Sequence, residues 1–237
     1  MIPGAFPIIA GGAKFKALGV NFDGSTWTRR TSNLTGIVDG PVGSLSFWLV
    51  IIPNGTFTDR VIFTLSPTIT VRIFISGTTG PGLTVLSSGK WSVGKTSLAA
   101  GWHHVVVSWQ TGPGVNLYVD GVFAQTQSNP SGNFDYTTNP IVFGAAFDGT
   151  APQMFDMAEF WFDPTFIDLS VPANIQKFRS ASGKPVNLGA NGSKPTGSQP
   201  AMYLRGGAAN FLTNLGYGGD FTVAAGTLGD SATSPSD

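Results

Sequence analysis

The sequence predicts an all-β protein, an antiparallel β-sandwich of jelly-roll type with one short helix. Apolar and polar residues alternate with a period of two along most of the chain, as they do in strands with one buried face. Gly, Pro, Asn and Asp interrupt the β-branched and aromatic runs at short intervals, and these residues supply turns. Sandwiches of about this length, here 237 residues, commonly fold as one domain.

The expected strands are short and follow one another closely. Their ranges are 14–18, 20–22, 26–29, 45–51, 60–65, 70–75, 83–86, 102–109, 115–123, 140–144 and 155–162, with two further strands at 201–204 and 221–223. The runs 102–109 and 115–123, joined by a Gly-Pro-Gly turn, make the clearest hairpin, and Asp120-Gly121 starts another turn. One short helix is expected between Val171 and Arg179, with Ser170 as its N-cap.

The chain is expected to divide into an arm, a sandwich and a tail. Residues 1–12 are apolar but carry Pro3 and Pro7 and no basic residue, which indicates an extended arm rather than a signal peptide. The sandwich takes residues 13–225, and from about residue 181 it continues as a Gly/Pro-rich extension. Residues 226–237 lack an apolar face for packing, which predicts a flexible tail.

Charge is sparse and balanced. The 13 basic and 13 acidic residues give no net charge, so the sequence carries no electrostatic signal for nucleic acid or an anionic membrane. No apolar run approaches the roughly 18 residues of a membrane span. A weakly charged surface favours association, so a homo-oligomer or a place in a larger assembly is expected, with a monomer as the alternative. With 0 cysteines there is no disulfide and no thiol nucleophile.

Several segments, taken in order, resemble a known family. They are the residues Val-Asn-Phe-Asp-Gly at 20–24, Ser-Phe-Trp at 46–48, Gly-Trp-His-His-Val at 101–105, Leu-Tyr-Val-Asp-Gly at 117–121 and Asp-Leu-Ser at 168–170. Over residues 13–180 this order resembles a laminin-G-like domain of the concanavalin A-like lectin/glucanase superfamily. The segment after residue 180 is similar to extensions of such proteins in bacteriophages and prophages.

The resemblance implies a non-enzymatic structural or adhesive protein of a bacteriophage particle, either a head decoration or a fibre or tail component. Its location would be the extracellular virion, and its partners would be other virion proteins, bound through the arm and the tail. The alternative is a lectin module that binds a glycan on a bacterial surface.

A third hypothesis is a β-glucan hydrolase. The hydrolase branch of the superfamily uses a strand motif Glu-x-Asp-x-x-Glu, which Asp156 and Glu159 match. Met154 occupies the position of the nucleophile, and a retaining mechanism requires two carboxylates. A thioether cannot form the glycosyl-enzyme intermediate, so the sequence predicts no enzyme of this kind. Asp156 and Glu159 then become ordinary polar positions on a strand.

Two further patterns in the sequence suggest a nucleotide site and a metal site, and the expected strands exclude both. Residues 89–96 fit the phosphate-loop pattern G-x-x-x-x-G-K-[ST], but a strand begins at about residue 101, which leaves no room for the helix that this loop requires. His103 and His104 are adjacent on a strand and therefore point to opposite faces, so they cannot bind one metal ion together. Hydrogen bonding within the fold explains both histidines.

Candidate binding residues are aromatic side chains for sugars and carboxylates for calcium. A sugar-binding surface needs exposed aromatic rings, and the candidates are Trp27, Trp91, Tyr136, Trp161 and Tyr217, although most aromatic residues of a sandwich belong to its core. No other cofactor is expected than a calcium ion, which some members of the family bind. Asp23 and Asp148 are the loop carboxylates that would hold it, without any D-x-[DN]-x-[DN] loop.

Overall fold

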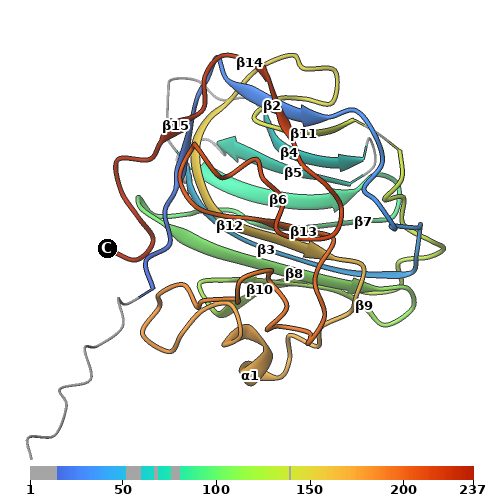
Figure 1. Ribbon diagram of the computed structural model, residues 1–237. Coiled ribbons are helices and arrows are strands. Elements are labelled where there is room, and N and C mark those ends of the chain that lie inside the picture. Colours follow the sequence, from blue (N-terminus) through green and yellow to red (C-terminus); the bar gives the residue numbers. More distant parts are fainter. Residues whose placement is uncertain (1–14, 52–59, 67–68, 76–80, 139) are drawn as a thin grey trace, which may run out of the picture.

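The computed structural model describes residues 15–51, 60–66, 69–75, 81–138 and 140–237. Two antiparallel sheets pack face to face around one core, and one short helix lies outside them (Figure 1). The predicted antiparallel β-sandwich is therefore confirmed. The expected arm at residues 1–12 lies outside the described residues. No helix in the described ranges is long and apolar enough to cross a membrane.

We call the two sheets A and B. Sheet A has the strand order β10-β9-β8-β3-β12-β1-β15, with β13 paired to β12. Its strands are β1 (Val20–Asp23), β3 (Val42–Ile51), β8 (His103–Gln110), β9 (Gly114–Val119), β10 (Val122–Gln127), β12 (Met154–Asp163), β13 (Met202–Leu204) and β15 (Gly229–Asp230).

Sheet B has the strand order β14-β2-β11-β4-β5-β6-β7. Its strands are β2 (Trp27–Arg30), β4 (Arg60–Ser66), β5 (Ile69–Ile75), β6 (Pro81–Ser87), β7 (Trp91–Lys95), β11 (Ile141–Phe143) and β14 (Thr222–Ala225). The outermost strands, β14 and β7, are far apart in sequence, so the sheet is complete only when the end of the chain returns to pair with β2.

Alternate residues of both sheets fill the space between them. Trp109 is fully buried at one end of this core. Its ring lies nearly parallel to that of Phe162, with centroids 6.2 Å apart, and its Nε1 donates to the Tyr136 hydroxyl over 2.8 Å. Gly43 lies against the Trp109 indole, and a Cβ there would overlap the ring. The core therefore requires glycine at this position of β3.

Sheet A is buried on its outer face as well. β3, β8 and β12 are buried at nearly every position instead of at alternate ones. The segment after β12, which includes α1 (Pro172–Ile175), covers this face (Figure 1). Its apolar side chains pack with those of the sheet in a second cluster made of Val106, Trp161, Ile167, Leu169, Ile175, Phe178, Leu188 and Tyr203. We call the segment 164–200 the outer layer.

The helix is shorter than predicted and begins one residue later. Val171 is the N-cap, makes no capping hydrogen bond through its side chain, and is followed by Pro172 in the first turn. Ser170 was expected to be the N-cap, and that prediction was wrong. Both its backbone N–H and its hydroxyl donate to Asp168 Oδ1, over 2.9 and 2.6 Å, so the Ser170 side chain closes the preceding turn instead.

The C-terminal segment packs along the beginning of the described chain. β15 pairs with β1, so that Val20 lies opposite Asp230. The Ser231 N–H donates to the Gly19 carbonyl over 2.9 Å, and the Ser234 hydroxyl donates to the Ala17 carbonyl. The expectation of a flexible tail at 226–237 without an apolar face for packing was therefore wrong. Leu228 is buried in the core, and backbone groups and serine hydroxyls hold the rest of the segment against the chain.

The β7 edge of sheet B is capped by two glutamine side chains from β10 of sheet A. The backbone N–H groups of Ser92 and Gly94 in β7 donate to Gln127 Oε1 and Gln125 Oε1, over 2.7 and 2.6 Å. Unpaired edge groups can pair with another chain. The two glutamines of β10 therefore hold this edge of the sandwich closed.

Candidate functional site

Three of the five predicted sugar-binding aromatic residues lie in the interior, which corrects the prediction for Trp91, Tyr136 and Trp161. All three side chains are buried. Trp91 packs against Trp109, with ring centroids 5.5 Å apart, and Trp161 lies in the cluster beneath the outer layer. Their rings are covered by protein, so a sugar cannot stack on them.

Trp27 and Tyr217 are partly exposed but belong to different parts of the surface. Trp27 lies on β2 in sheet B, where its ring packs against Gly149 and the Arg29 guanidinium lies 5.6 Å from its centroid. Tyr217 lies in the loop before β14, where its backbone N–H donates to the carbonyl of Pro200. The five predicted aromatic residues therefore do not form one platform.

Asp23 and Asp148 each close a local turn. Asp23 Oδ1 accepts hydrogen bonds from Ser25 and Thr26, which lower the pKa of this carboxyl to about 2. Asp148 Oδ1 accepts both the backbone and the hydroxyl hydrogen bond of Thr150, which lower its pKa as well.

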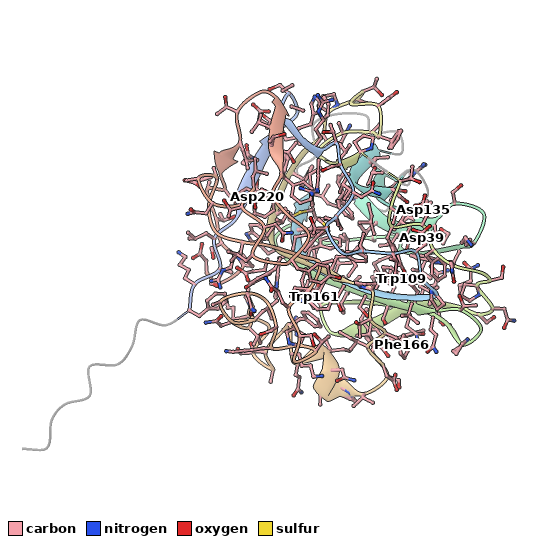
Figure 2. All side chains as sticks on the ribbon, turned by 45° about the vertical axis from the view of Figure 1, so that its right-hand side comes forward. Asp39, Trp109, Asp135, Trp161, Phe166 and Asp220 are labelled. Atoms are coloured by element: carbon pink, nitrogen blue, oxygen red, sulfur yellow. The ribbon has the colours of Figure 1, made fainter. Side chains whose placement is uncertain are left out.

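No group of three or more acidic, His or Cys residues suited to a metal ion occurs in the described part of the chain. Other carboxylates also serve turns: Asp39 and Asp135, which Figure 2 shows on the same side of the molecule, accept hydrogen bonds from residues 136–138. Calcium binding stays a prediction.

The two carboxylates of the glucanase-like motif are engaged in structural contacts. Asp156 accepts hydrogen bonds from Asn21 Nδ2 over 2.7 Å and from the Ser231 hydroxyl over 2.6 Å. Glu159 lies in a β-bulge with φ of +48°, and its Oε2 accepts a 2.7 Å bond from the Tyr203 hydroxyl. Burial raises the pKa of Glu159. Neither side chain is exposed to an incoming sugar.

The open face of the sandwich is the outer face of sheet B, and it carries a pocket of about 280 Å³. Thr64 of β4 and Thr70 of β5 are directly paired across the strands. Their neighbours Phe63, Leu65 and Ile69 belong to the core, so both threonines point outward into the pocket. Thr64 is 0% and Thr70 is 6% exposed, and neither Oγ1 has a hydrogen-bond partner among the described residues.

The loop after β11 forms one wall of this pocket. Phe147, which is 37% exposed, and Asp148 both line it, and Arg72 of β5 lines it as well. The site thus combines hydroxyl groups on its floor, an accessible aromatic ring and charged side chains. Such a combination of an apolar surface with a few directed polar groups is typical of pockets for small polar molecules.

Comparison with known proteins identifies the fold family. The sequence pattern of the concanavalin A-like lectin/glucanases superfamily matches residues 25–163, which is more than half of the chain. The chain belongs to this superfamily. The matched part of this superfamily member ends with β12, so the outer layer lies beyond it. None of the curated proteins compared with the sequence matches it.

Two solved structures share the sandwich. A native heptameric SAP-like pentraxin from Limulus polyphemus aligns over 92% of this chain and 96% of its own, with 12% identity and a TM-score of 0.59. A "putative carbohydrate binding protein" from Bacteroides ovatus aligns over 93% of this chain with 12% identity and a TM-score of 0.64, and this chain spans 62% of its length. At this identity the likeness shows the fold alone.

Sequence reasoning missed the threonine pocket. The alternation in residues 60–75 does place Thr64 and Thr70 opposite to the core residues, so their outward direction could be found. Nothing in the sequence indicates that the loop holding Phe147 folds beside them, because that contact joins segments about 80 residues apart.

Proposed function

We propose that this protein is a non-enzymatic glycan-binding module and that a sugar occupies the pocket on the outer face of sheet B. The observation that carries the proposal is the pair of buried, unpartnered hydroxyls of Thr64 and Thr70 on the pocket floor. A buried polar group without a partner costs about 1–3 kcal/mol. Sugar hydroxyls both donate and accept hydrogen bonds, so a bound sugar would satisfy both threonines.

Three further features support a sugar over another small polar molecule. Phe147 offers an aromatic ring against which the apolar face of a sugar can pack. Asp148 and Arg72 can bind hydroxyl groups at the rim. The superfamily is named for lectins as well as glucanases, and the glucanase-like carboxylates of this chain are buried.

Replacing Thr64 and Thr70 by valine tests this proposal. Valine keeps the shape of threonine and removes only the hydroxyl, so Thr64→Val/Thr70→Val should weaken binding of a glycan selected on an array by about tenfold or more. The free energy of unfolding should stay equal or rise, because two unsatisfied buried groups are lost. Titration calorimetry and urea unfolding measure the two quantities.

Thr96→Val, at an exposed position outside the pocket, is the matched control and should change neither quantity. Unchanged glycan affinity in the double valine variant would show that the sugar binds elsewhere. Absence of binding to any glycan by the wild-type protein on a broad bacterial array would contradict the function itself.

As the setting of this module we propose a bacteriophage particle, in which copies of the chain assemble and attach to a bacterial surface glycan. The exposed apolar side chains Val38, Val122 and Phe123 favour association of the folded domain. The low content of charged residues, 11%, acts in the same direction. The resemblance of the segment after residue 180 to phage proteins supports the virion.

Light scattering tests the assembly. We expect an oligomer in solution that is lost, or becomes smaller, when residues 1–12 are deleted, because an apolar arm can bind a neighbouring subunit. The deletion should leave the circular dichroism spectrum of the sandwich unchanged. A protein that is monomeric both with and without these residues, at all concentrations tested, would exclude assembly through the arm.

A further inference from the structure

A second pocket lies at the margin of the outer layer, on the side of sheet A that faces away from the core. Its volume is about 310 Å³, and it is lined by Arg205, Gly206, Asn210, Thr213 and Leu215. Leu215 packs against the cluster beneath the outer layer, and Arg205 Nη1 donates to the carbonyl of Gly189 in that layer. We call this pocket the arginine pocket. It is separate from the threonine pocket, which lies on the outer face of sheet B.

The alternation along β13 directs Arg205 to this side of sheet A. Met202 and Leu204 belong to the core between the sheets, and Tyr203 belongs to the cluster beneath the outer layer. Arg205 follows Leu204 and therefore lies on the same side as Tyr203. Its Cζ lies 5.6 Å from the centroid of the Tyr203 ring and 5.0 Å from that of the Phe15 ring. Two aromatic rings thus hold the guanidinium in place.

A buried carboxylate lies behind the guanidinium. Glu159 is 3% exposed, and its Oε1 has no hydrogen-bond partner among the described residues and lies 3.7 Å from Arg205 Nε. Its backbone has a φ of +48°, a strained conformation for a residue other than glycine. Such residues concentrate at binding sites, where the surrounding structure maintains the strain. Glu159 therefore holds Arg205 from the protein side, while the pocket lies in front of it.

Arg205 keeps hydrogen-bond donors for a ligand. A guanidinium has five N–H donors. The Nε lies beyond hydrogen-bond distance of Glu159, and the bond from Nη1 to the Gly189 carbonyl is long, at 3.4 Å. The side chain is 25% exposed, and no Asp or Glu is found among the described residues of the lining. The positive charge and the remaining donors favour an anion in the pocket.

We propose that the arginine pocket binds a compact anionic group, a carboxylate or a phosphate, through the Arg205 guanidinium. The planar guanidinium matches both groups because it forms two parallel hydrogen bonds with either. Asn210 and Thr213 line the pocket at exposed positions and offer an amide and a hydroxyl to the rest of the ligand, and Leu215 offers an apolar contact. This site goes beyond the proposed function, since it requires no sugar in the threonine pocket.

The test is a titration of the full chain, followed by the backbone N–H signals of Gly206 and Asn210 in a 1H–15N spectrum. Sodium acetate, glucuronate and phosphate, at constant pH and at ionic strength held constant with sodium chloride, should shift both signals saturably, and uncharged glucose should not. The N–H signals of Ser92 and Gly94, at the β7 edge of sheet B, should not move. Tighter binding of glucuronate than of acetate assigns the pocket to acidic sugars, equal binding assigns it to the carboxylate alone, and tightest binding of phosphate assigns it to phosphates.

Arg205→Gln removes the charge and should weaken anion binding about tenfold or more. Arg205→Lys keeps the charge and loses the paired hydrogen bonds, so it should weaken binding less, and it tests the site if Arg205→Gln does not fold. Arg29→Gln, the same substitution at an exposed position on β2 outside the pocket, should leave binding unchanged. Absence of a saturable shift with all three anions would overturn the proposal, and so would full affinity in Arg205→Gln.

The result does not depend on the glycan-binding function. Thr64→Val/Thr70→Val should keep the anion-induced shifts of Gly206 and Asn210, because the threonines line the other pocket. A protein that binds a neutral glycan and shows no anion response refutes the arginine pocket alone. An anion response without glycan binding on an array supports the arginine pocket and contradicts the proposed function.

Discussion

Replacing Trp161 by alanine is expected to lower the free energy of unfolding by about 3–5 kcal/mol. Trp161 lies on the outer face of β12 and is fully buried beneath the outer layer. Its ring meets that of Phe178 edge to face at 5.2 Å, and its Nε1 donates to the Gly192 carbonyl over 2.9 Å. The substitution removes both contacts and leaves a cavity between sheet and layer. Urea unfolding followed by circular dichroism measures the loss.

Two variants separate the contributions to this loss. Trp161→Phe keeps an aromatic ring and removes the indole N–H, so its loss should be smaller than that of Trp161→Ala. Val38→Ala, at an exposed position, should change stability by no more than about 0.5 kcal/mol. In Trp161→Ala, trypsin should cleave faster after Lys177 and Arg179, which lie in the outer layer. Wild-type stability in Trp161→Ala would show that the layer does not depend on this side chain.

The same tryptophan shows where sequence reasoning about the site fails. Trp27 and Trp161 both lie on strands, at outward positions of their sheets. The local alternation of apolar and polar residues therefore predicts the same exposure for both. The structure buries Trp161 because residues 164–200 fold over sheet A. Trp27 has the loop at Gly149 against its ring and remains partly exposed. Exposure here depends on contacts between distant segments, which a period of two does not encode.

Most of the fold follows from local signals. The hairpin between residues 102 and 123 is present as β8 and β9, and the Asp120-Gly121 turn starts β10, because both residues have positive φ, of 54° and 77°. The order of strands in each sheet is not local. β3, for example, lies between β8 and β12, which are far along the chain, and only the packing of the whole core determines this arrangement.

The two histidines of β8 lie on opposite faces of the strand, and their pKa values are shifted in opposite directions. His103 Nδ1 lies 2.6 Å from Asp120 Oδ2, and its Nε2 lies 2.9 Å from the Ala99 carbonyl. Both partners are acceptors, so the protonated ring, with an N–H on each nitrogen, can donate to both, and the bond to Asp120 raises the pKa of His103. His104 lies on the other face beside Ser46, and burial lowers its pKa to about 3, with a smaller effect of the Arg179 charge.

These shifts predict that the joint contribution of the two histidines to the free energy of unfolding is largest near pH 6.5, the ordinary pKa of histidine. Below this pH the unfolded chain protonates His104 and the folded chain does not, so His104 alone lowers stability by about 1.4 kcal/mol per pH unit, down toward pH 5. The raised pKa of Glu159 opposes this contribution. Above it, stability is lost as pH rises through the raised pKa of His103, whose protonated form is stabilised only in the folded state. Urea unfolding between pH 5 and 9 at constant salt should therefore give a curve with two limbs.

His103→Gln should remove the alkaline limb and keep the acid limb. The loss of stability above pH 6.5 comes from deprotonation of His103, whereas the loss below pH 6.5 comes from His104. Its stability at pH 6 should be lower than that of the wild type by about 1.5–3 kcal/mol, the value of a hydrogen bond to a charged group. In NMR titrations the ring signals of His103 should titrate above pH 6.5, and those of His104 should not titrate between pH 5 and 9. An alkaline limb that persists in His103→Gln would assign it to another group, and titration of His104 near pH 6.5 would show that its side of β8 is open to water.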